Sequence, residues 1–450
     1  MKILLFILSS LFIQFLCFES NFELQYANWN EKQIISSLRN IYIEIDASFG
    51  SKMEKFKLAL DLDSHAMTIP SVNCTIADEN IKKFSGSTSF QTIGEKYFSG
   101  ERAFHGILGT DDFKLGENGV IIKNTRFILA DQYSSSQRYN YKYAFMGLKS
   151  SINDDDYNKS IIGQMKEKKF ISDQIWFLNF NSDTKGNFVI GALPHTLYQN
   201  VYNESDMISQ NCLQTSYLCI LQFENIYLGK PGEQSSTEYN LAQGKFSINT
   251  KLFISTPNYG DYISNFFKKH KDACNQVTLD DNYISYYCQK DKFKIDEIGY
   301  LNFTLPKDKA EMDFIFEPKD LFYEKDGILY FLIIYKPNDQ IAPVDDYAWT
   351  LGTTFLQKYL ITFKRDEKSI VHFYTKKMSE VQGGDGDGNK TKYIIIIVVL
   401  SFVFLACIAF LIFYIIKIKP RKKKANELDD DGFDYQTKQN EEGNSALINE

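Results

Sequence analysis

The chain has 450 residues, of which 44% are hydrophobic and 24% are charged, and its formal net charge is −7 at pH 7. This composition is typical of a folded protein, and it excludes a fibrous or a wholly disordered chain. The 57 acidic residues outnumber the 50 basic ones. A general nucleic-acid-binding protein is therefore excluded as well, because such a protein needs a positive field to neutralise phosphates.

The chain begins with a short apolar run. Lys2 precedes apolar residues that continue to Leu16. A positive start followed by a short apolar stretch is typical of a secretory signal peptide. We therefore predict a signal peptide over residues 1–18, cleaved between Leu16 and Ser20, with an uncleaved N-terminal anchor as the alternative.

A second apolar run, residues 393–416, contains no charged side chain. As a helix rising about 1.5 Å per residue it is long enough to cross a hydrocarbon core of about 30 Å. Six lysines and arginines follow between residues 417 and 424, and such clusters stay on the cytoplasmic side. We predict a transmembrane helix over residues 393–416, a cytoplasmic tail over residues 417–450, and a luminal or extracellular ectodomain.

The cysteines of the ectodomain also indicate the secretory route. Five lie between the two apolar runs, which suits an oxidising compartment but leaves at least one thiol unpaired or bonded to another chain. Neither their spacing nor that of the histidines suits a zinc site, and we predict no metal and no cofactor. The cysteines are Cys74, Cys212, Cys219, Cys274 and Cys288. Four sequons predict glycosylation, at Asn73, Asn158, Asn203 and Asn302.

Most of the ectodomain is predicted to be β-structure. Short runs rich in Tyr, Phe, Ile and Val, many bounded by turn residues, indicate strands. The clearest runs are residues 41–45, 56–60, 188–190, 329–334 and 370–373. Helical spacing of apolar residues predicts two helices, over residues 161–168 and 262–270. Residues 379–392 include a run rich in glycine and aspartate, which favours a flexible stalk before the membrane.

Two segments carry a resemblance to a known family. Residues 56–71 place a strand before Asp61, then a turn, then a second strand ending at Pro70 and Ser71. This resembles the first active-site loop of the pepsin-like aspartic proteases. Residues 349–363, Trp-Thr-Leu-Gly-Thr-Thr-Phe-Leu-Gln-Lys-Tyr-Leu-Ile-Thr-Phe, resemble the family's C-terminal block and are the more specific match. The resemblance extends over residues 41–374 in the family's order.

The resemblance implies a mostly β, bilobal pepsin-like fold with a weak internal duplication. We expect an N-terminal lobe over residues 19–212, a C-terminal lobe over residues 213–378 and the stalk over residues 379–392. It also implies a disulfide between Cys274 and Cys288. With less support from the family, Cys212 and Cys219 are expected to pair, which leaves Cys74 as the odd thiol.

The catalytic positions implied by the resemblance are Asp61 and Asn249. In the family two carboxylates share one proton, so that one draws a proton from water while the other donates to the substrate carbonyl. Asn249 can hold a water molecule but cannot exchange that proton. Leu62 replaces a threonine, whereas Asp63 and Lys251 replace glycines that let backbones approach closely, so we expect the loops to be spread.

Residues 96–109 align with the flap that covers the family's cleft. Ser99 stands at the position of the family's tyrosine, with Tyr97 and Gly100 beside it. We treat these three residues as candidate cleft residues.

Three functions follow from these residues. The first is a single-pass membrane homologue of aspartic peptidases that lacks activity and binds a peptide or protein in its cleft. The second is an active, divergent aspartic endopeptidase relying on Asp61, and the third is a structural surface protein with a vestigial cleft. The sequence places the protein in a membrane of the secretory or endolysosomal route or at the cell surface, and it indicates no oligomeric state.

Overall fold

The computed structural model describes residues 17–26, 30, 33–62, 64–75, 82–85, 87–99, 104–117, 119–133, 144–149, 160–213, 219–231, 236–306, 312–337, 348–365 and 369–377. The chain divides into two compact units, Met1–Gly383 and Gly384–Glu450. The second unit and residues 1–16 lie outside the described residues, and with them the predicted transmembrane helix, the tail and most of the signal peptide. In the part of the chain that is described, no helix is long and apolar enough to cross a membrane.

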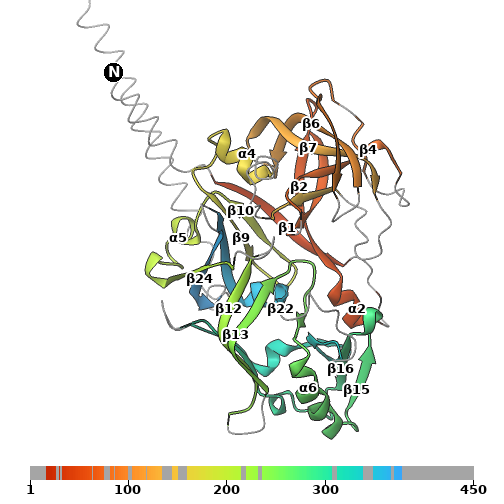
Figure 1. The fold of residues 1–450 in the computed structure, drawn as a ribbon, viewed down its shortest axis with the longest axis vertical. Coiled ribbons are helices and arrows are strands. Elements are labelled where there is room, and N and C mark those ends of the chain that lie inside the picture. Colours follow the sequence, from red (N-terminus) through yellow and green to blue (C-terminus); the bar gives the residue numbers. More distant parts are fainter. Residues whose placement is uncertain are drawn as a thin grey trace, which may run out of the picture. The chain divides into compact units, whose positions relative to one another are not determined.

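The largest sheet has 13 strands, in the order β11-β24-β23-β9-β10-β1-β2-β3-β8-β4-β7-β6-β5. Figure 1 labels β1, β2, β4, β6, β7, β9, β10 and β24 of this sheet. Four of the predicted strands, residues 41–45, 56–60, 188–190 and 370–373, lie within it, and the mostly β prediction is confirmed. Its strands are β1 (Phe18–Tyr26), β2 (Ile41–Phe49), β3 (Glu54–Asp61), β4 (Thr68–Thr75), β5 (Gln91–Ser99), β6 (Phe104–Leu115), β7 (Ile121–Tyr133), β8 (Ala144–Gly147), β9 (Gln174–Phe180), β10 (Lys185–Ile190), β11 (Met207–Asn211), β23 (Tyr359–Arg365) and β24 (Ser369–Lys377).

Two smaller sheets form most of the remaining structure. A seven-stranded sheet has the order β18-β17-β12-β13-β22-β14-β21, and a four-stranded sheet has the order β15-β16-β20-β19. Their strands are β12 (Ile220–Gly229), β13 (Ser236–Phe246), β14 (Phe253–Ile254), β15 (Cys274–Thr278), β16 (Ile284–Gln289), β17 (Tyr300–Thr304), β18 (Asp313–Phe316), β19 (Phe322–Lys325), β20 (Ile328–Phe331), β21 (Ile333–Ile334) and β22 (Ala348–Leu351).

The predicted strand over residues 329–334 is divided between these two sheets. β20 pairs with β16 and β19, whereas β21 pairs with β14. Between them Leu332 donates its N–H to the carbonyl of Leu321 at 2.9 Å. The apolar run is continuous in sequence, but the chain leaves one sheet and joins another at Leu332.

The helices found among the described residues have at most 12 residues. The predicted helix over residues 161–168 is α4 (Ile161–Glu167), whose first turn is capped by Ser160. The predicted helix over residues 262–270 is α6, which begins at Asn258, four residues earlier than predicted, because the polar residues of its first turn interrupt the apolar spacing. The others are α2 (Ile34–Arg39), α5 (Pro194–Leu197), α7 (Thr353–Lys358) and the 3-10 segments Glu204–Asp206, Asp280–Asn282, Ile295–Glu297 and Pro318–Leu321.

One local topology occurs twice, as the expected internal duplication requires. In the first copy β3 runs parallel to β8, and β4 pairs antiparallel with β8 and parallel with β7. In the second copy β13 runs parallel to β22, and β14 pairs antiparallel with β22 and parallel with β21. The loops that follow β3 and β13 therefore occupy equivalent places in the two copies.

Two disulfides stabilise the described part of the chain, and both were predicted. Cys212 is bonded to Cys219, and Cys274 is bonded to Cys288 in the neighbouring strand. Cys74 carries a free, buried thiol, as expected for the odd cysteine. Burial raises the pKa of the Cys74 thiol to about 11, which keeps it protonated and poorly nucleophilic at neutral pH.

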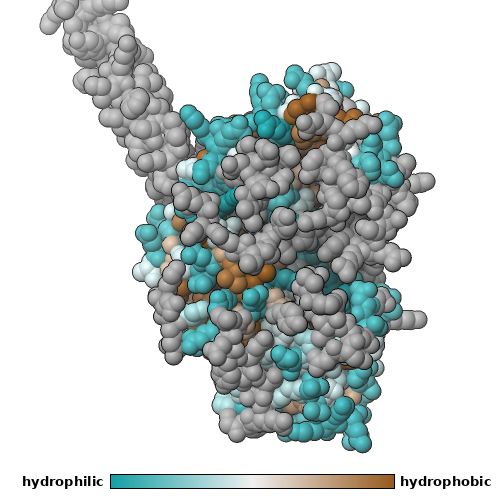
Figure 2. All heavy atoms as spheres, viewed as in Figure 1, coloured by the Kyte–Doolittle hydropathy of each residue, from teal (hydrophilic) through white to brown (hydrophobic). Residues whose placement is uncertain are grey.

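The surface in Figure 2 is mostly hydrophilic where it is coloured, with apolar side chains gathered in small areas. On β6 and β7, Ile107 and Ile121 are exposed. Of the sequons, Asn73 and Asn203 are exposed, whereas Asn302 uses its amide nitrogen to donate to Asp313 Oδ1 at 3.0 Å. Asn158 lies outside the described residues.

Candidate active site

The first loop of the candidate site starts at the end of β3. Asp61 is the last residue of that strand, and its side chain is fully buried. Its carbonyl oxygen accepts a hydrogen bond from the N–H of Leu148 at 2.7 Å. Leu62, which stands where the resembled family has a threonine, follows Asp61 and is also buried. Asp63 lies outside the described residues.

A glycine holds this loop in place. Gly147 of β8 lies opposite Asp61 in the parallel register. A Cβ atom on Gly147 would be 2.4 Å from the carbonyl oxygen of Ser64, so the loop packs directly on the glycine backbone. Gly147 was not predicted as a site residue, although the apolar run at residues 144–148 that a single glycine interrupts is a usable signal.

The second loop starts after β13. The carbonyl oxygen of Asn249 accepts a hydrogen bond from the N–H of Ile41 at 3.1 Å, and its N–H donates to Ser247 Oγ at 3.3 Å. The side-chain oxygen of Asn249 is buried, and it has no hydrogen-bond partner among the residues that the structure describes. The side-chain oxygen of Asn249 is thus an acceptor that no described residue uses.

A second glycine repeats the role of Gly147. A Cβ atom on Gly352 would be 2.3 Å from the carbonyl oxygen of Leu252 and 2.7 Å from that of Thr250. The hydroxyl of Thr354 donates to the carbonyl of Lys251 at 2.6 Å, which fixes the loop further. The two loops that contain Asp61 and Asn249 thus each pack on a glycine: Gly147 at the end of β8, and Gly352 directly after β22.

Lys251 is the most unusual residue of the second loop, because its long charged side chain is inside the protein. It is only 5% exposed, its N–H donates to the carbonyl of Leu38 at 2.8 Å, and its Nζ lies 5.4 Å from the centre of the Tyr323 ring. Burial lowers the pKa of Lys251, and the nearby charge of Asp183 opposes that shift only partly. The loop therefore accommodates a residue larger than glycine at an electrostatic cost.

Replacing Lys251 with methionine is expected to stabilise the protein by on the order of 1 kcal/mol at pH 7, because a similar volume is kept and a buried charge is removed. The pKa of Lys251 is lower in the folded than in the unfolded chain, so protonation favours unfolding. The free-energy cost of burying charged Lys251 is absent at pH values above the pKa that Lys251 has in the unfolded chain. The cost grows as the pH falls through that value, and it is complete below the pKa that Lys251 has in the folded protein. Denaturant unfolding of wild type and Lys251→Met from pH 7 to pH 11 measures the difference.

The gain should therefore be largest at neutral pH and shrink toward pH 11. Lys292→Met, at an exposed lysine, is the matched control and should change stability little at any pH. A Lys251→Met variant no more stable than wild type at pH 7 would contradict an energetic cost of burying this lysine.

The predicted flap corresponds to the hairpin of β5 and β6. Tyr97 pairs with Gly106 and Ser99 pairs with Phe104, and Gly100 lies outside the described residues. β5 is the last strand of the 13-stranded sheet. An edge strand offers backbone groups to which an extended peptide can bind.

Within the described ranges, no group of three His, Cys, Asp or Glu side chains is placed to hold a metal ion. The histidines found there serve local contacts instead. His195 Nδ1 lies 2.8 Å from the hydroxyl of Tyr374, and His372 Nδ1 lies 2.8 Å from Ser209 Oγ.

The comparison with known families agrees with this geometry. The family model described as eukaryotic aspartyl protease matches residues 42–230. The matched segment begins in β2, contains the complete first copy of the repeated topology with Asp61, and ends just after β12, before Asn249. No curated protein matches the chain.

Proposed function

From the eukaryotic aspartyl protease domain at residues 42–230, we propose that this protein is a pepsin-like homologue that binds a peptide or protein in its cleft without cleaving it. The observation that carries the proposal is Asn249. It follows β13 in the second copy of the repeated topology, as Asp61 ends β3 in the first copy.

The chemistry of an asparagine at this position supports the loss of catalysis. Peptide hydrolysis by this family needs one ionised and one protonated carboxyl group that exchange roles during the reaction. The amide of Asn249 donates and accepts hydrogen bonds but does not take up or release a proton at any usual pH. Asp61 alone therefore supplies at most half of the required proton transfers.

The features that would bind a peptide are present in this chain, whereas the second carboxylate that hydrolysis needs is not. Both loops have their supporting glycines, Gly147 and Gly352, and the β5–β6 hairpin presents an edge strand. A peptide bound as an added strand depends on backbone hydrogen bonds rather than on a pair of carboxylates. Binding without cleavage is consistent with both features.

The proposal includes a membrane anchor on the secretory route. Two disulfides support an oxidising compartment. The uncharged run over residues 393–416 and the basic cluster after it support a single-pass topology with the C-terminus in the cytosol. The ectodomain then faces the lumen or the cell exterior.

The test of activity uses the full-length chain in a mild non-ionic detergent, with denatured casein as substrate between pH 3 and pH 7. Wild type and Asp61→Ala should both release no more peptide than the buffer. Asn249→Asp alone should not create activity, because Leu62 and Lys251 still occupy the two loops. Cleavage by wild type that disappears in Asp61→Ala would overturn the proposal and establish an active, divergent aspartic endopeptidase.

The test of binding separates a functional cleft from a vestigial one. Peptides selected on the detergent-solubilised chain from a random library should slow hydrogen exchange at the amides of β5, since a strand added there forms new backbone hydrogen bonds. A library that yields no peptide protecting β5 would favour a structural surface protein instead.

A further inference from the structure

Residues 34–41 form a segment that lies on the second loop of the candidate site. The segment consists of α2, its C-terminal cap and the first residue of β2. The carbonyl oxygen of Leu38 accepts a hydrogen bond from the N–H of Lys251 at 2.8 Å. The N–H of Ile41 donates in turn to the carbonyl oxygen of Asn249 at 3.1 Å. One bond runs in each direction, as between antiparallel strands, so the segment occupies backbone groups that an extended peptide could use instead.

The side chains of α2 also cover this loop. Three of them are buried in one apolar cluster with Leu252 of the loop, whose side chain has no exposed surface. Lys251 is nearly as deeply buried, and so is the side-chain oxygen of Asn249. The second loop is therefore closed to a ligand as long as α2 stays in this position. The three α2 residues of the cluster are Ile34, Ile35 and Leu38.

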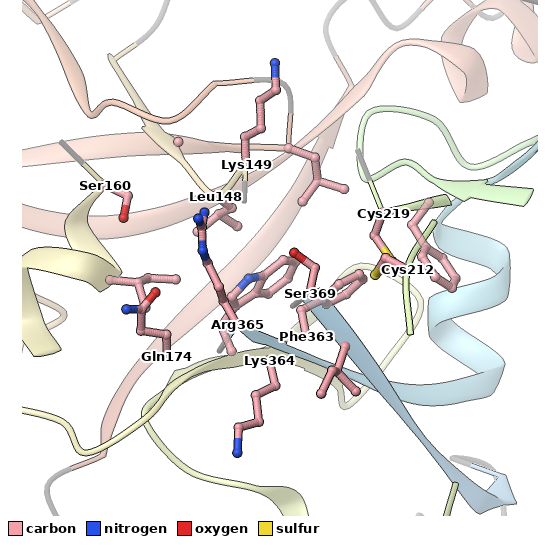
Figure 3. Close-up of a pocket in the computed structure, with 16 residues that line it drawn as sticks. Leu148, Lys149, Ser160, Gln174, Cys212, Cys219, Phe363, Lys364, Arg365 and Ser369 are labelled. Atoms are coloured by element: carbon pink, nitrogen blue, oxygen red, sulfur yellow. A yellow bond between two sulfur atoms is a disulfide. The ribbon is translucent and has the colours of Figure 1, made fainter. Parts of the chain in front are cut away.

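The first loop has no corresponding cover in the part of the chain that is described. Its backbone at Asp61 and Ser64 is bonded to the N–H groups of Leu148 and Lys149, which directly follow β8. Leu62 and Leu148 line a small cavity beside this loop, and Figure 3 shows Leu148 and Lys149 at its wall. Among the described residues, the two copies of the repeated topology thus differ in that α2 lies on the second loop only.

The contacts that hold α2 in place are few. The helix has six residues, and a helix of this length is not stable by itself in water. Besides the apolar cluster, Arg39 Nη2 lies 3.0 Å from Oδ2 of Asp281, whose side chain is largely exposed. An exposed ion pair of this kind adds little stability. A segment held by so few contacts can open locally while the sheets remain folded.

We propose that α2 is a strap that closes the second loop and that a peptide ligand displaces it. This inference rests on the function proposed above, because it concerns access to the same cleft. The peptide and residues 38–41 compete for the N–H of Lys251 and the carbonyl of Asn249. Once the strap is displaced, the side-chain oxygen of Asn249 is also accessible as an acceptor. The apparent affinity for peptide is then lowered by the fraction of molecules in which the strap is closed.

Hydrogen exchange of the full-length chain in non-ionic detergent, with and without a peptide selected from the random library, gives the first test. The peptide should slow exchange at the amides of β5. It should at the same time speed exchange at Ser37 and Asn40, whose N–H groups bond within the α2 segment, because the displaced helix is unstable alone. A peptide that protects β5 while α2 stays equally protected would overturn the strap. No peptide binding at all would instead refute the proposed function.

Variants of the strap give the second test. The double variant Leu38→Ala/Arg39→Gln should speed exchange at the Lys251 amide and tighten peptide binding about tenfold, because the strap is open more often. Arg39→Gln alone keeps the apolar cluster and should tighten binding about threefold. The matched control is Leu305→Ala/Arg126→Gln, at two residues that do not belong to the cluster or contact Asp281. It should bind peptide as wild type does.

Thermal unfolding without peptide checks that each variant is folded, and Arg39→Gln alone decides the matter if the double variant does not fold. Unchanged exchange at the Lys251 amide in the folded variants would show that these side chains do not hold a strap. Faster exchange at Lys251 without tighter peptide binding would show that the strap does not cover the peptide site. Either result would overturn the proposal and leave peptide binding itself intact.

Discussion

Replacing Trp349 with alanine is expected to lower the free energy of unfolding by about 3–5 kcal/mol, the usual cost of removing a large aromatic side chain from a packed core. Trp349 lies in β22 and is completely buried. Its ring meets Tyr259 edge to face at 4.8 Å and Phe303 at 5.4 Å. The variant loses these contacts and leaves a cavity that its rigid neighbours do not fill.

The matched control is Trp349→Phe. The indole Nε1 of Trp349 has no hydrogen-bond partner in the described structure, so phenylalanine loses packing but no polar contact. Its cost should stay below about 2 kcal/mol. Denaturant unfolding of the full-length chain in detergent compares the two variants. A loss below about 1 kcal/mol in Trp349→Ala would contradict the central place of this residue in the core around β22.

The features that sequence predicts best are those set by short-range pattern. The strands over residues 41–45 and 56–60 and the helix over residues 161–168 follow from the spacing of apolar residues within each segment. The division of residues 329–334 between two sheets does not follow from such spacing. It depends on strands that are remote in sequence, because the residues before Leu332 pair with β16 and those after it pair with β14. A continuous apolar run carries no information on which sheet each half joins.

In the candidate site, too, residues in local motifs were predicted from the sequence, whereas contacts between remote segments were not. Asp61 and Asn249 were identified from local motifs that resemble those of a known family. Asp61 is the last residue of β3, whereas Asn249 lies beyond Phe246, the last residue of β13. The burial of Lys251 was not predicted, since it depends on Leu38 and Tyr323, which come from other parts of the chain.

The two copies of the repeated topology have the same loop-supporting glycine but different side chains at the candidate catalytic position. Gly147 and Gly352 each lie where a side chain would collide with the backbone of the adjacent loop, so both loops keep the close packing that positions residues 61 and 249. Under the proposed function, the amide of Asn249 in place of a carboxylate alters only what this position can do with a proton. The two supported loops would then still present a cleft to a peptide.

Removing the disulfide between Cys274 and Cys288 is expected to cost about 3 kcal/mol of unfolding free energy in the chain-entropy model. The bond closes a loop of sequence separation 14, so breaking it returns conformational freedom mainly to the unfolded chain. Both cysteines are buried, at 5% and 0% exposure, and the double alanine variant also loses their packing. Urea unfolding of Cys274→Ala/Cys288→Ala against wild type measures the total.

The second disulfide provides the matched control for this prediction. Cys212 and Cys219 close a shorter loop, of sequence separation 7, and both are partly exposed. The double variant Cys212→Ala/Cys219→Ala should therefore lose less stability than Cys274→Ala/Cys288→Ala, since both the entropy of the closed loop and the buried volume are smaller. The reverse order, or no loss in the Cys274–Cys288 variant, would mean that the four-stranded sheet is held by its strand pairing alone. In that case the bond would add no constraint that β15 and β16 do not already provide.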